Sequence, residues 1–586
     1  MTGEYTASIE EPRADAQAPV SDSVMDLGIA RADLPHEFYP AEKKLLEHAA
    51  RGEECVVGAD VPAVASESNR MRAEFLRFLL LGGSETTPVH PGGVWLRGAY
   101  IAGELRLHGC QDLRRFGLRN CYFDSRINLR DANVPLLYLR GCRVTTIDAD
   151  RVRVLGDVFL NSGFKVNGQV RLLGAHIGGN LECSGGIFHH CKGVAINCDG
   201  ATIGGDVFLR NGFEADGAVR FAGAEIGGQF SCIDAKFNNF DDIALDCSRA
   251  KIGASVYVCS GFAAAGEVRF VGAEIAGNVN CYGGIFRNLN LNAKRNCAAD
   301  ALNFGGAEIR DTLRLGPRSS PYNQQVIIEG SMTLAGAHVG TLVDHPNSWP
   351  VESVQTTKHG ALDCIISLNG FTYNRLRGAA PTDAETRRRW LRRQSAGALA
   401  ENFRPQPFEQ LIKVLRGMGH DEDARQIAMF KQEISLPLQV KRSAWWRRPF
   451  VWLVGRLWGL SCGYGYRPHR LVVALIVLWL GCGGAFQVAA DAGALIPADA
   501  QVWTNERLGE KCEPNWIACA AVEKALPFNA MIYSADILIP IIDLRQRSVW
   551  TPTQSWIRAI AWMENILGSL SVLLLGAILS GLVKRD

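Results

Sequence analysis

The chain has 586 residues, of which 47% are hydrophobic and 21% are charged, and this length and composition support a large core with further segments. Its 62 Lys and Arg almost balance its 60 Asp and Glu, which gives a formal net charge of +2. A general nucleic-acid-binding surface needs an excess of basic residues, so the charge balance argues against that class of function.

The first segment of the chain is polar. Residues 1–35 contain few large apolar side chains, so we expect them to be disordered. No secretory signal peptide is visible there, because the segment is acidic and lacks an apolar run. Helices are predicted over residues 41–52 and 71–83, and the apolar side chains of the second helix fall largely on one side. We therefore expect residues 36–90 to form a helical cap that covers the open end of the next domain.

The middle of the chain repeats itself every 49 residues. The segment GQVRLLGAHIGGNLECSGGIF at Gly168 returns as GAVRFAGAEIGGQFSCIDAKF at Gly217 and as GEVRFVGAEIAGNVNCYGGIF at Gly266. Each unit holds two similar halves of 26 and 23 residues, in which apolar and polar residues alternate between Gly-Gly and Asn-Gly pairs. This alternation predicts strands, and the glycine pairs predict corners. Such a period is typical of a solenoid, so we predict a mainly β protein in which residues 91–378 form a parallel β-helix, called the rod from here on.

Columns of equivalent residues predict what fills the rod. Coils about 4.8 Å apart bring like residues into internal ladders. Two of the expected ladders are Phe188, Phe213, Phe237, Phe262 and Phe286, and Cys183, Leu209, Cys232, Val258 and Cys281. Neighbouring Cys of one ladder are two coils apart and beyond the reach of a disulfide, so we expect buried free thiols. A series of small α/β units is the alternative, but no segment from Gly92 to Gly340 is long and periodic enough for a helix.

Residues 379–440 are predicted to form a helical hairpin. Four apolar residues with helical spacing precede Gly417 and Gly419, which break the helix before a second one: Phe408, Leu411, Ile412 and Leu415. A hairpin of this kind is used in protein–protein contacts. The basic run RRRWLRR lies before it, within Thr382–Gln394. We interpret this run as a solvated helix face near an anionic membrane, with contact to phosphate groups as the alternative.

Two segments near the C-terminus are apolar enough to cross a membrane. Leu471–Ala490 has twenty residues without a charge, and Ile566–Val583 has eighteen. About twenty apolar residues span the hydrocarbon core of a bilayer, and a buried helix of a soluble protein is the alternative for each segment. The predicted order is a basic interfacial segment 441–469, a transmembrane helix 470–490, an extracytoplasmic loop 491–558, a transmembrane helix 559–583 and a tail 584–586.

Basic residues predict the orientation of the two spans. Residues 441–470 hold seven Lys or Arg and no Asp or Glu, and the tail adds Lys584 and Arg585. The positive-inside rule therefore places the rod and both termini in the cytoplasm and the loop outside, although Arg545, Arg547 and Arg558 in the loop weigh against it. Trp and Phe accompany the basic residues before the first span. This segment is therefore predicted to lie on the inner leaflet, with three side chains at the membrane surface: Arg447, Arg448 and Arg456.

The loop between the spans carries two further predictions. Cys512 and Cys519 lie seven residues apart in a compartment predicted to be oxidising, so a local disulfide is expected. The segment 528–545 is too short to span a bilayer, and it contains Tyr533, Asp536, Pro540 and Asp543. This segment is either an element packed on the two spans or a re-entrant loop of a pore, and a pore would require a homo-oligomer. The glycine filter sequence of potassium channels is missing from it.

No catalytic, metal or cofactor site is predicted. The chain lacks the GxxxxGK[ST], HExxH and GxSxG motifs, a CxxC pair, and a GxGxxG motif after a strand. The run HHC from His189, with Cys183 and Cys198, could form a ligand set, but the sister repeats hold other residues there, so we interpret it as incidental. Glu182 and Asp206 are carboxylates of the kind that β-helix carbohydrate-active enzymes place on one face, and such an enzyme is the least favoured alternative.

Motifs spread over nearly the whole chain resemble a known family. They are MRAEFLRFLLLGG from Met71, the GAxIGG repeats, QPFEQLIKVLRGMGHDEDAR from Gln406, GYGYRPHR from Gly463 and YSADILIPIIDLRQRSVW from Tyr533. A chain with these motifs resembles the bacterial two-span repeat proteins named membrane-associated oxidoreductases. The resemblance implies a location in the bacterial inner membrane and, by name, redox chemistry, although no nucleotide, flavin, haem or cluster motif accompanies it. The rod is also similar in general design to pentapeptide-repeat and other β-solenoid proteins, although its period is not five.

These observations favour a function without catalysis. We predict a membrane-tethered scaffold or sensor that contacts membrane lipid and whose cytoplasmic rod or helical hairpin binds an unknown protein partner. An oligomeric two-span channel or transport component is the first alternative. A membrane-associated oxidoreductase, which rests on the family name alone, is the second.

Overall fold

The computed structural model describes residues 38–317, 325–356, 360–464, 466–499, 501, 512, 515–517, 519, 527–539 and 541–580. The predictions for residues 1–35, for Pro540 and for the tail 584–586 lie outside these residues. The chain divides into two compact units. The first unit runs to Ala398 and includes Glu409–His420, and the second consists of Leu399–Phe408 and the chain from Asp421 onward.

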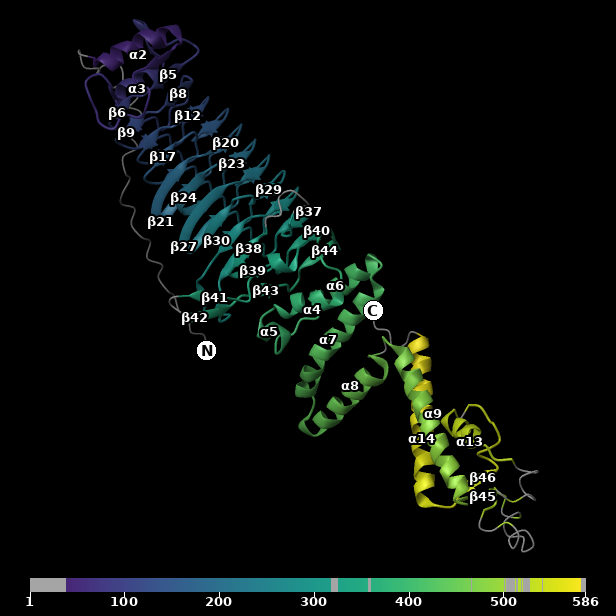
Figure 1. Cartoon of the computed structure of the whole chain (residues 1–586). Coiled ribbons are helices and arrows are strands. Elements are labelled where there is room, and N and C mark those ends of the chain that lie inside the picture. The colour runs from purple at the N-terminus through teal and green to yellow at the C-terminus, as the bar shows by residue number, and fades with distance from the viewer. Residues whose placement is uncertain are drawn as a thin grey trace, which may run out of the picture. The chain divides into compact units, whose positions relative to one another are not determined.

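The first unit is built from stacked coils of short strands (Figure 1). One coil contains four strands that begin five or six residues apart: β17 (Lys165–Val166), β18 (Val170–Arg171), β19 (His176–Ile177) and β20 (Leu181–Glu182). Each strand pairs in parallel with its counterpart in the next coil, as His176 does with Thr202. The stacks form two long parallel sheets, which is the β-helix architecture that the repeat predicts. The sequence repeat identifies whole coils, and the structure shows that such a coil is divided further into short strands five or six residues apart.

The two sheets contain 20 and 18 of the described strands. The larger sheet consists of β1 (Glu54–Val56), β5 (Val94–Arg97), β8 (Phe116–Arg119), β11 (Asn133–Val134), β12 (Leu137–Tyr138), β15 (Arg153–Val154), β16 (Val158–Phe159), β19, β20, β22 (Thr202–Ile203), β23 (Val207–Phe208), β25 (Glu225–Ile226), β26 (Phe230–Ser231), β28 (Lys251–Ile252), β29 (Val256–Tyr257), β31 (Glu274–Ile275), β32 (Val279–Asn280), β37 (Glu308–Arg314), β40 (His338–Val343) and β44 (Thr372–Leu376). The smaller sheet consists of β2 (Arg70–Arg72), β6 (Tyr100–Ala102), β7 (Leu105–Arg106), β9 (Tyr122–Phe123), β10 (Ile127–Asn128), β13 (Arg143–Val144), β14 (Ile147–Asp148), β17, β18, β21 (Ile187–Asn197), β24 (Phe213–Arg220), β27 (Ala235–Asp246), β30 (Ala263–Arg269), β33 (Ile285–Arg287), β36 (Asp300–Asn303), β38 (Ile327–Glu329), β39 (Ser331–Thr333) and β43 (Ile366–Ser367).

The predicted ladders fill the interior of the rod. Neighbouring rings of the phenylalanine ladder have centroids 5.2 to 5.4 Å apart, close to the spacing of the coils: Phe188, Phe213, Phe237, Phe262 and Phe286. All five side chains are fully buried, and so is the ladder that runs from Cys183 to Cys281. Because each coil repeats the same inward residues, the rod has a continuous apolar core along its length.

Polar side chains join neighbouring coils at one corner of the rod. The Asp157 carboxylate accepts a hydrogen bond from the backbone N–H of Asn180 at 2.7 Å. The side-chain oxygen of Asn180 accepts one from the backbone N–H of Asp206, also at 2.7 Å. Asp206 in turn accepts from the N–H of Gln229 at 2.8 Å, while Glu182 accepts from the N–H of Ser184 in its own coil at 3.1 Å. Glu182 and Asp206 therefore bind backbone groups, which gives these two carboxylates structural roles and disfavours the carbohydrate-active alternative.

Both helices predicted at the N-terminal end are present as α2 (Pro40–Arg51) and α3 (Ala73–Leu80). Glu42 of α2 is buried, and its carboxylate forms an ion pair with Arg72 at 2.5 Å. Between the two helices, β1 and β2 already pair in parallel with β5 and β6. The sheets therefore begin inside the segment predicted to be the cap. A short antiparallel pair follows α3, formed by β3 (Gly83–Ser84) and β4 (Thr87–Pro88).

The last coil of the rod contains β43 and β44, which pair with β39 and β40. Helix α4 (Ala384–Arg392) follows, and then α5 (Ala396–Leu399) and α6 (Gln406–Gly417). Leu411, Ile412 and Leu415 are buried, as their helical spacing predicts, and α6 ends at the predicted break. Two antiparallel pairs and a 3-10 turn extend from the coils: β34 (Leu291–Asn292) with β35 (Cys297–Ala298), β41 (Ser353–Thr356) with β42 (Gly360–Asp363), and η1 (Pro346–Ser348).

The second unit is mostly helical. It contains α7 (Asp421–Arg442), η2 (Trp445–Arg447), α8 (Arg448–Cys462), α9 (Pro468–Asp491), α13 (Ala530–Leu538), α14 (Ser555–Leu579) and the antiparallel pair of β45 (Leu495–Pro497) with β46 (Trp550–Pro552). His469–Asp491 and Ser555–Ile578 are long and apolar enough to cross a membrane, with mean hydropathies of 2.2 and 1.5. The second of these helices begins before residue 559, the predicted start of the span.

Candidate functional site

Helix α13 packs against both long apolar helices of the second unit. Two glycines provide the room: a side chain at Gly568 of α14 would collide with the backbone oxygen of Leu538, and one at Gly483 of α9 would collide with the Met531 sulfur. The indole N–H of Trp479 on α9 also donates a hydrogen bond to the backbone oxygen of Met531 at 2.9 Å. The group of α9, α13 and α14 is called the bundle from here on. In the bundle, the short helix α13 lies between the two candidate spans, α9 and α14.

The structure separates the predicted loop residues into different environments. Tyr533 is buried in the bundle, with its ring centroid 4.9 Å from that of Phe486. Asp536 is also buried, and its carboxylate accepts hydrogen bonds from three backbone N–H groups, those of Leu544, Gln546 and Arg547, at 2.8 to 3.0 Å. Asp543 is exposed and accepts from the N–H of Arg545 at 2.9 Å. Asp536 therefore fixes the turn that follows α13, and the three described residues, Tyr533, Asp536 and Asp543, lie in different surroundings.

A buried carboxyl group in the bundle was not part of the predicted site. Glu564 of α14 has no exposed surface, and its Oε1 is within hydrogen-bonding distance of the Ser534 hydroxyl of α13. The same hydroxyl lies 3.2 Å from the backbone oxygen of Trp479 on α9. The second carboxyl oxygen of Glu564, Oε2, has no hydrogen-bond partner among the described residues. The signal in the sequence is a single Glu at the start of an otherwise apolar segment, but its partner on α13 is thirty residues away.

Cys512 and Cys519 form a disulfide, with their Cα atoms 5.2 Å apart. No other disulfide is present among the cysteines whose side chains are described, and the free cysteines among them are all buried. Cys512 packs in the apolar cluster that also contains Phe486, Tyr533 and Trp550. The disulfide therefore ties the described part of the loop to the end of the bundle.

Helix α8 exposes a large apolar surface. Its exposed side chains, together with those of the preceding turn, are Trp445, Trp446, Phe450, Trp452, Leu453, Val454, Leu457 and Leu460, with Trp445 80% exposed. Arg447, Arg448 and Arg456 are exposed among them, and the guanidinium groups of Arg447 and Arg456 lie over the rings of Trp446 and Trp452. The other face of α8 meets α7, where Gly455 lies against Leu436. Aromatic, aliphatic and basic side chains on one exposed face are typical of a helix at a membrane surface.

A recess of about 610 Å3 lies on the smaller sheet of the rod. It forms where β21, β24 and β27 lengthen and their pairing shifts register, so that residues near His190, Gly217 and Phe240 bulge outward. The lining includes three carboxylates and one arginine: Asp216, Asp242, Asp246 and Arg220. Phe240 at its edge is 71% exposed, which is unusual for a residue of this sheet. Asp216 also lies 2.5 Å from His189, so this histidine pairs with a carboxylate.

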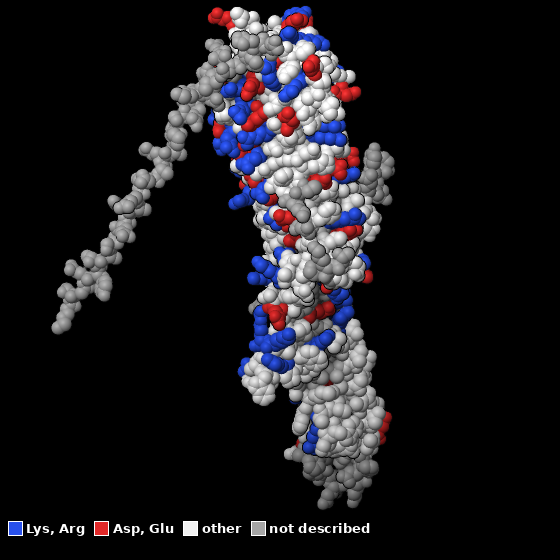
Figure 2. Space-filling model, turned by 90° about the vertical axis from the view of Figure 1, so that its left-hand side faces the viewer, with Lys and Arg blue, Asp and Glu red and all other residues white. Residues whose placement is uncertain are grey.

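Charges alternate along the same sheet rather than forming a patch. Along one column of this sheet, the strand register sets Asp148 opposite Arg171 and Asp246 opposite Arg269, with Asn197 and Arg220 between them. Ion pairs such as Arg171 with Asp150 and Arg220 with Asp199 connect successive coils. Figure 2 shows the basic and acidic side chains interleaved along the rod. Acidic and basic side chains are mixed on this surface, which does not favour a polyanion as its ligand.

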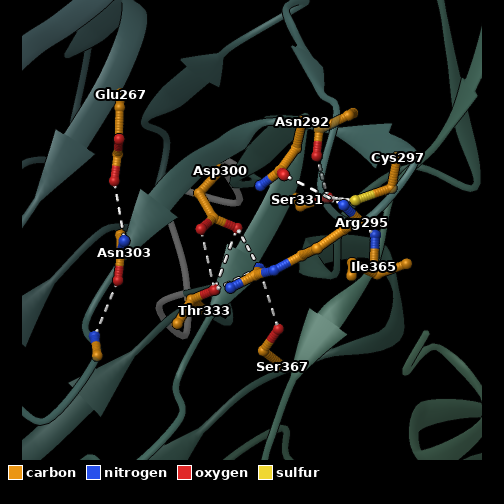
Figure 3. A network of polar contacts seen from close by, with 12 residues as sticks. Glu267, Asn292, Arg295, Cys297, Asp300, Asn303, Ser331, Thr333, Ile365 and Ser367 are labelled. Atoms are coloured by element: carbon orange, nitrogen blue, oxygen red, sulfur yellow. Dashed lines mark hydrogen bonds and ion pairs between the residues drawn. The ribbon is translucent and has the colours of Figure 1, made fainter. Parts of the chain in front are cut away.

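A polar network lies near the C-terminal end of the same sheet (Figure 3). Arg295, from the turn between β34 and β35, reaches Asp300 at 3.5 Å and the hydroxyls of Thr333 and Ser367 at 3.4 Å each. Thr333 donates to Asp300 at 3.1 Å, and burial raises the pKa of this carboxyl above its usual range. Because the network joins one hairpin to three successive coils, its contacts explain the packing of the hairpin.

Five buried cysteines of the rod lack the environment of reactive thiols. Burial raises the pKa of Cys183, Cys198, Cys232, Cys247 and Cys281, so these thiols stay protonated near neutral pH. In the described part of the chain, no group of three or more His, Cys, Asp or Glu side chains is placed to hold a metal ion.

No protein-family model, curated protein or solved structure matches this chain. The family resemblance therefore rests on the sequence motifs.

Proposed function

We propose that this protein is a membrane-anchored β-solenoid, in which α9 and α14 span the bilayer and the rod presents a protein-binding surface in the cytoplasm. The observation that carries the anchor is the exposed apolar surface of the second unit. Besides α8, the two long helices expose Val473, Val477, Leu480, Trp562, Ile566 and Leu573. Water would oppose the exposure of so many large apolar side chains on one unit, whereas a bilayer would cover them.

The disulfide supports the orientation that the basic residues predict. Cys512 and Cys519 are paired, whereas the described cysteines of the rod are free. Disulfides persist in oxidising compartments and are rare in the cytoplasm. A loop outside the cell membrane and a rod in the cytoplasm would account for the paired and the free cysteines. The bacterial inner membrane is the proposed location.

Extraction and labelling test the anchor and its orientation. The full chain is expected to stay with the membrane after alkaline carbonate washing and to be released by detergent. After mild reduction of intact spheroplasts, a membrane-impermeant maleimide is expected to label Cys512 and Cys519. Release by carbonate would contradict the anchor, and labelling of the two cysteines only after lysis would contradict the orientation.

A spin label tests the position of α8. The variant Leu457→Cys, labelled in nanodiscs, is expected to collide with oxygen more often than with a water-soluble nickel chelate, because Leu457 lies on the exposed apolar face. Arg249→Cys on the rod is the control and should show the reverse preference, since Arg249 lies on the surface of the solenoid. Equal accessibilities at both sites would place α8 in water.

The recess around Phe240 is the proposed protein-binding surface of the rod. An exposed aromatic ring beside three carboxylates and one arginine complements a partner that offers an apolar side chain next to basic ones. Phe240→Ser is expected to abolish the crosslinking of any partner specific to this surface. Leu155→Ser, which removes an equally exposed apolar side chain elsewhere on the rod, should leave the crosslink unchanged. A partner lost from both variants or from neither would contradict this assignment.

A channel or transport component is the second candidate, and the position of α13 favours it. A short helix held between two candidate spans is the arrangement expected of a re-entrant segment in an oligomeric pore. A closed oligomer in nanodiscs and ion flux through reconstituted liposomes would support this function. A protein that stays monomeric and passes no ions would exclude it.

A further inference from the structure

The carboxyl group of Glu564 lies in the interior of the bundle, where no counter-charge faces it among the described residues. The side chain is 0% exposed, and no Lys or Arg of the described chain is within ion-pair distance of it. An ionised carboxylate in such a place loses its hydration and gains no opposite charge in return. The bundle can accommodate this group far more easily as a neutral acid.

The hydrogen bonds around Glu564 also require an additional proton. The Ser534 hydroxyl carries one hydrogen, yet it lies within hydrogen-bonding distance of two acceptors, Glu564 Oε1 and the backbone oxygen of Trp479. If Glu564 is ionised, the hydroxyl can serve only one of these acceptors. If Glu564 is protonated, its O–H donates to Ser534, and the Ser534 O–H donates to Trp479. The neutral acid therefore completes a chain of hydrogen bonds that the carboxylate leaves incomplete.

This chain connects the three helices of the bundle. Glu564 lies on α14, Ser534 on α13 and Trp479 on α9, and the Trp479 indole returns a second hydrogen bond to α13. The chain lies beside the two close helix contacts at Gly483 and Gly568. The position of α13 thus depends on a group that can gain or lose a proton.

We propose that Glu564 is a proton-binding site, whose neutral acid holds α13 against α9 and α14 and whose deprotonation releases α13. The inference goes beyond the anchor and needs only the packing of the bundle, in a bilayer or outside one. Once the proton is lost, a charge is left in the interior of the bundle, and the movement of α13 toward solvent relieves it.

Other titratable groups near Glu564 either have partners of their own or, like the Cys482 thiol, lie within hydrogen-bonding reach of Glu564 itself. Cys482 of α9 is the nearest, and Tyr533, Asp536 and Arg547 lie on or after α13. The Tyr533 hydroxyl donates to the backbone oxygen of Trp550, and Asp536 accepts three backbone N–H bonds. The Cys482 thiol is buried in the apolar cluster. Among these groups, Glu564 is the one whose neutral form completes the hydrogen bonds of the bundle.

A lipophilic carbodiimide tests the neutral acid directly. The acid proton moves to a nitrogen of dicyclohexylcarbodiimide while the carboxyl oxygen bonds to its central carbon, and acyl transfer to nitrogen then gives a stable N-acylurea without a leaving group. Applied to the full chain in nanodiscs, the reagent is expected to label Glu564 near pH 6 and to lose about tenfold in rate per pH unit once the proton is lost. The exposed Asp543 is the matched control, and a water-soluble carbodiimide should label it first. Equal labelling of Glu564 and Asp543 by the water-soluble reagent would overturn the proposal.

A neutral isostere separates the proton from the packing. The amide of Glu564→Gln can donate to Ser534 at every pH, so the variant is expected to match the wild type near pH 6 and to remain stable near pH 9. The wild type should lose thermal stability over this range, because its stabilising form is the protonated one, which is lost as the pH rises. The same pH dependence in both proteins would overturn the proposal. If the variant does not fold, the labelling of the wild-type protein decides alone.

Discussion

Arg387 is the residue whose environment differs most from its sequence context. It belongs to the basic run on α4 that we interpreted as a solvated face, yet it is 0% exposed. Its guanidinium donates two hydrogen bonds to Asp344, at 2.8 and 2.9 Å, and one to the backbone oxygen of Pro381 at 2.7 Å. Trp349 donates to the same carboxylate at 2.9 Å. For this arginine the interpretation of a solvated side chain is wrong, because α4 turns it toward the last coils of the rod.

Loss of this arginine is expected to destabilise the first unit strongly. Arg387→Met leaves the Asp344 charge buried without its partner, which should cost about 3 to 5 kcal/mol of unfolding free energy. Arg389→Met on the same helix removes an exposed arginine and should change stability by less than about 0.5 kcal/mol. Urea unfolding followed by circular dichroism compares the two variants. Similar midpoints for both would show that the buried pair contributes little.

The thiols of the rod are expected to resist alkylation. Burial raises the pKa of Cys364 to about 11, so only about one molecule in a thousand carries its thiolate at pH 8. Because the shift is upward, reactivity should increase as the pH rises and remain low near neutrality. Mass spectrometry after iodoacetamide treatment of the native protein checks this, with a urea-unfolded sample as the control. A rod cysteine modified as quickly in the native protein as in urea would contradict the buried state.

At the scale of elements, the phenylalanine ladder shows how one coil stabilises the next. Each ring contacts the equivalent ring above and below it, so one substitution affects two interfaces. Phe237→Ala should cost about 3 to 5 kcal/mol, because it opens a cavity between two coils. Phe240→Ala, three residues later on β27, removes an exposed ring and should be close to neutral. Unfolding midpoints that are equal for the two variants would show that the ladder does not stabilise the rod.

The ends of the rod illustrate a second property of its elements. The sequence predicts helices before the first coil, and α2 and α3 are there. It does not reveal that β1 and β2 add to the sheets, because three-residue strands carry too little periodicity to be recognised. Such strands exist because the adjacent coil offers unpaired backbone groups that they can satisfy.

At the scale of the whole molecule, the assembly state and bound cofactors distinguish the proposed functions. The full chain in nanodiscs is expected to be a monomer or dimer without visible absorbance, as an anchored scaffold requires. Native mass spectrometry and absorption spectroscopy of the same sample measure both properties. A closed ring without a cofactor would favour the channel component. A coloured protein would contradict the scaffold and support the redox chemistry that the family name implies.

The sequence by itself determined the properties that depend on repetition and on long apolar runs. A column of Phe every coil can only be buried if the coils stack, and twenty uncharged residues identify a candidate span without any contact information. The tertiary structure decided which polar residues meet. Arg387 lies 43 residues from Asp344, Glu564 lies 30 residues from Ser534, and the recess at Phe240 needs three coils in register. No local pattern encodes these contacts, because each depends on the geometry that brings separate segments of the chain together.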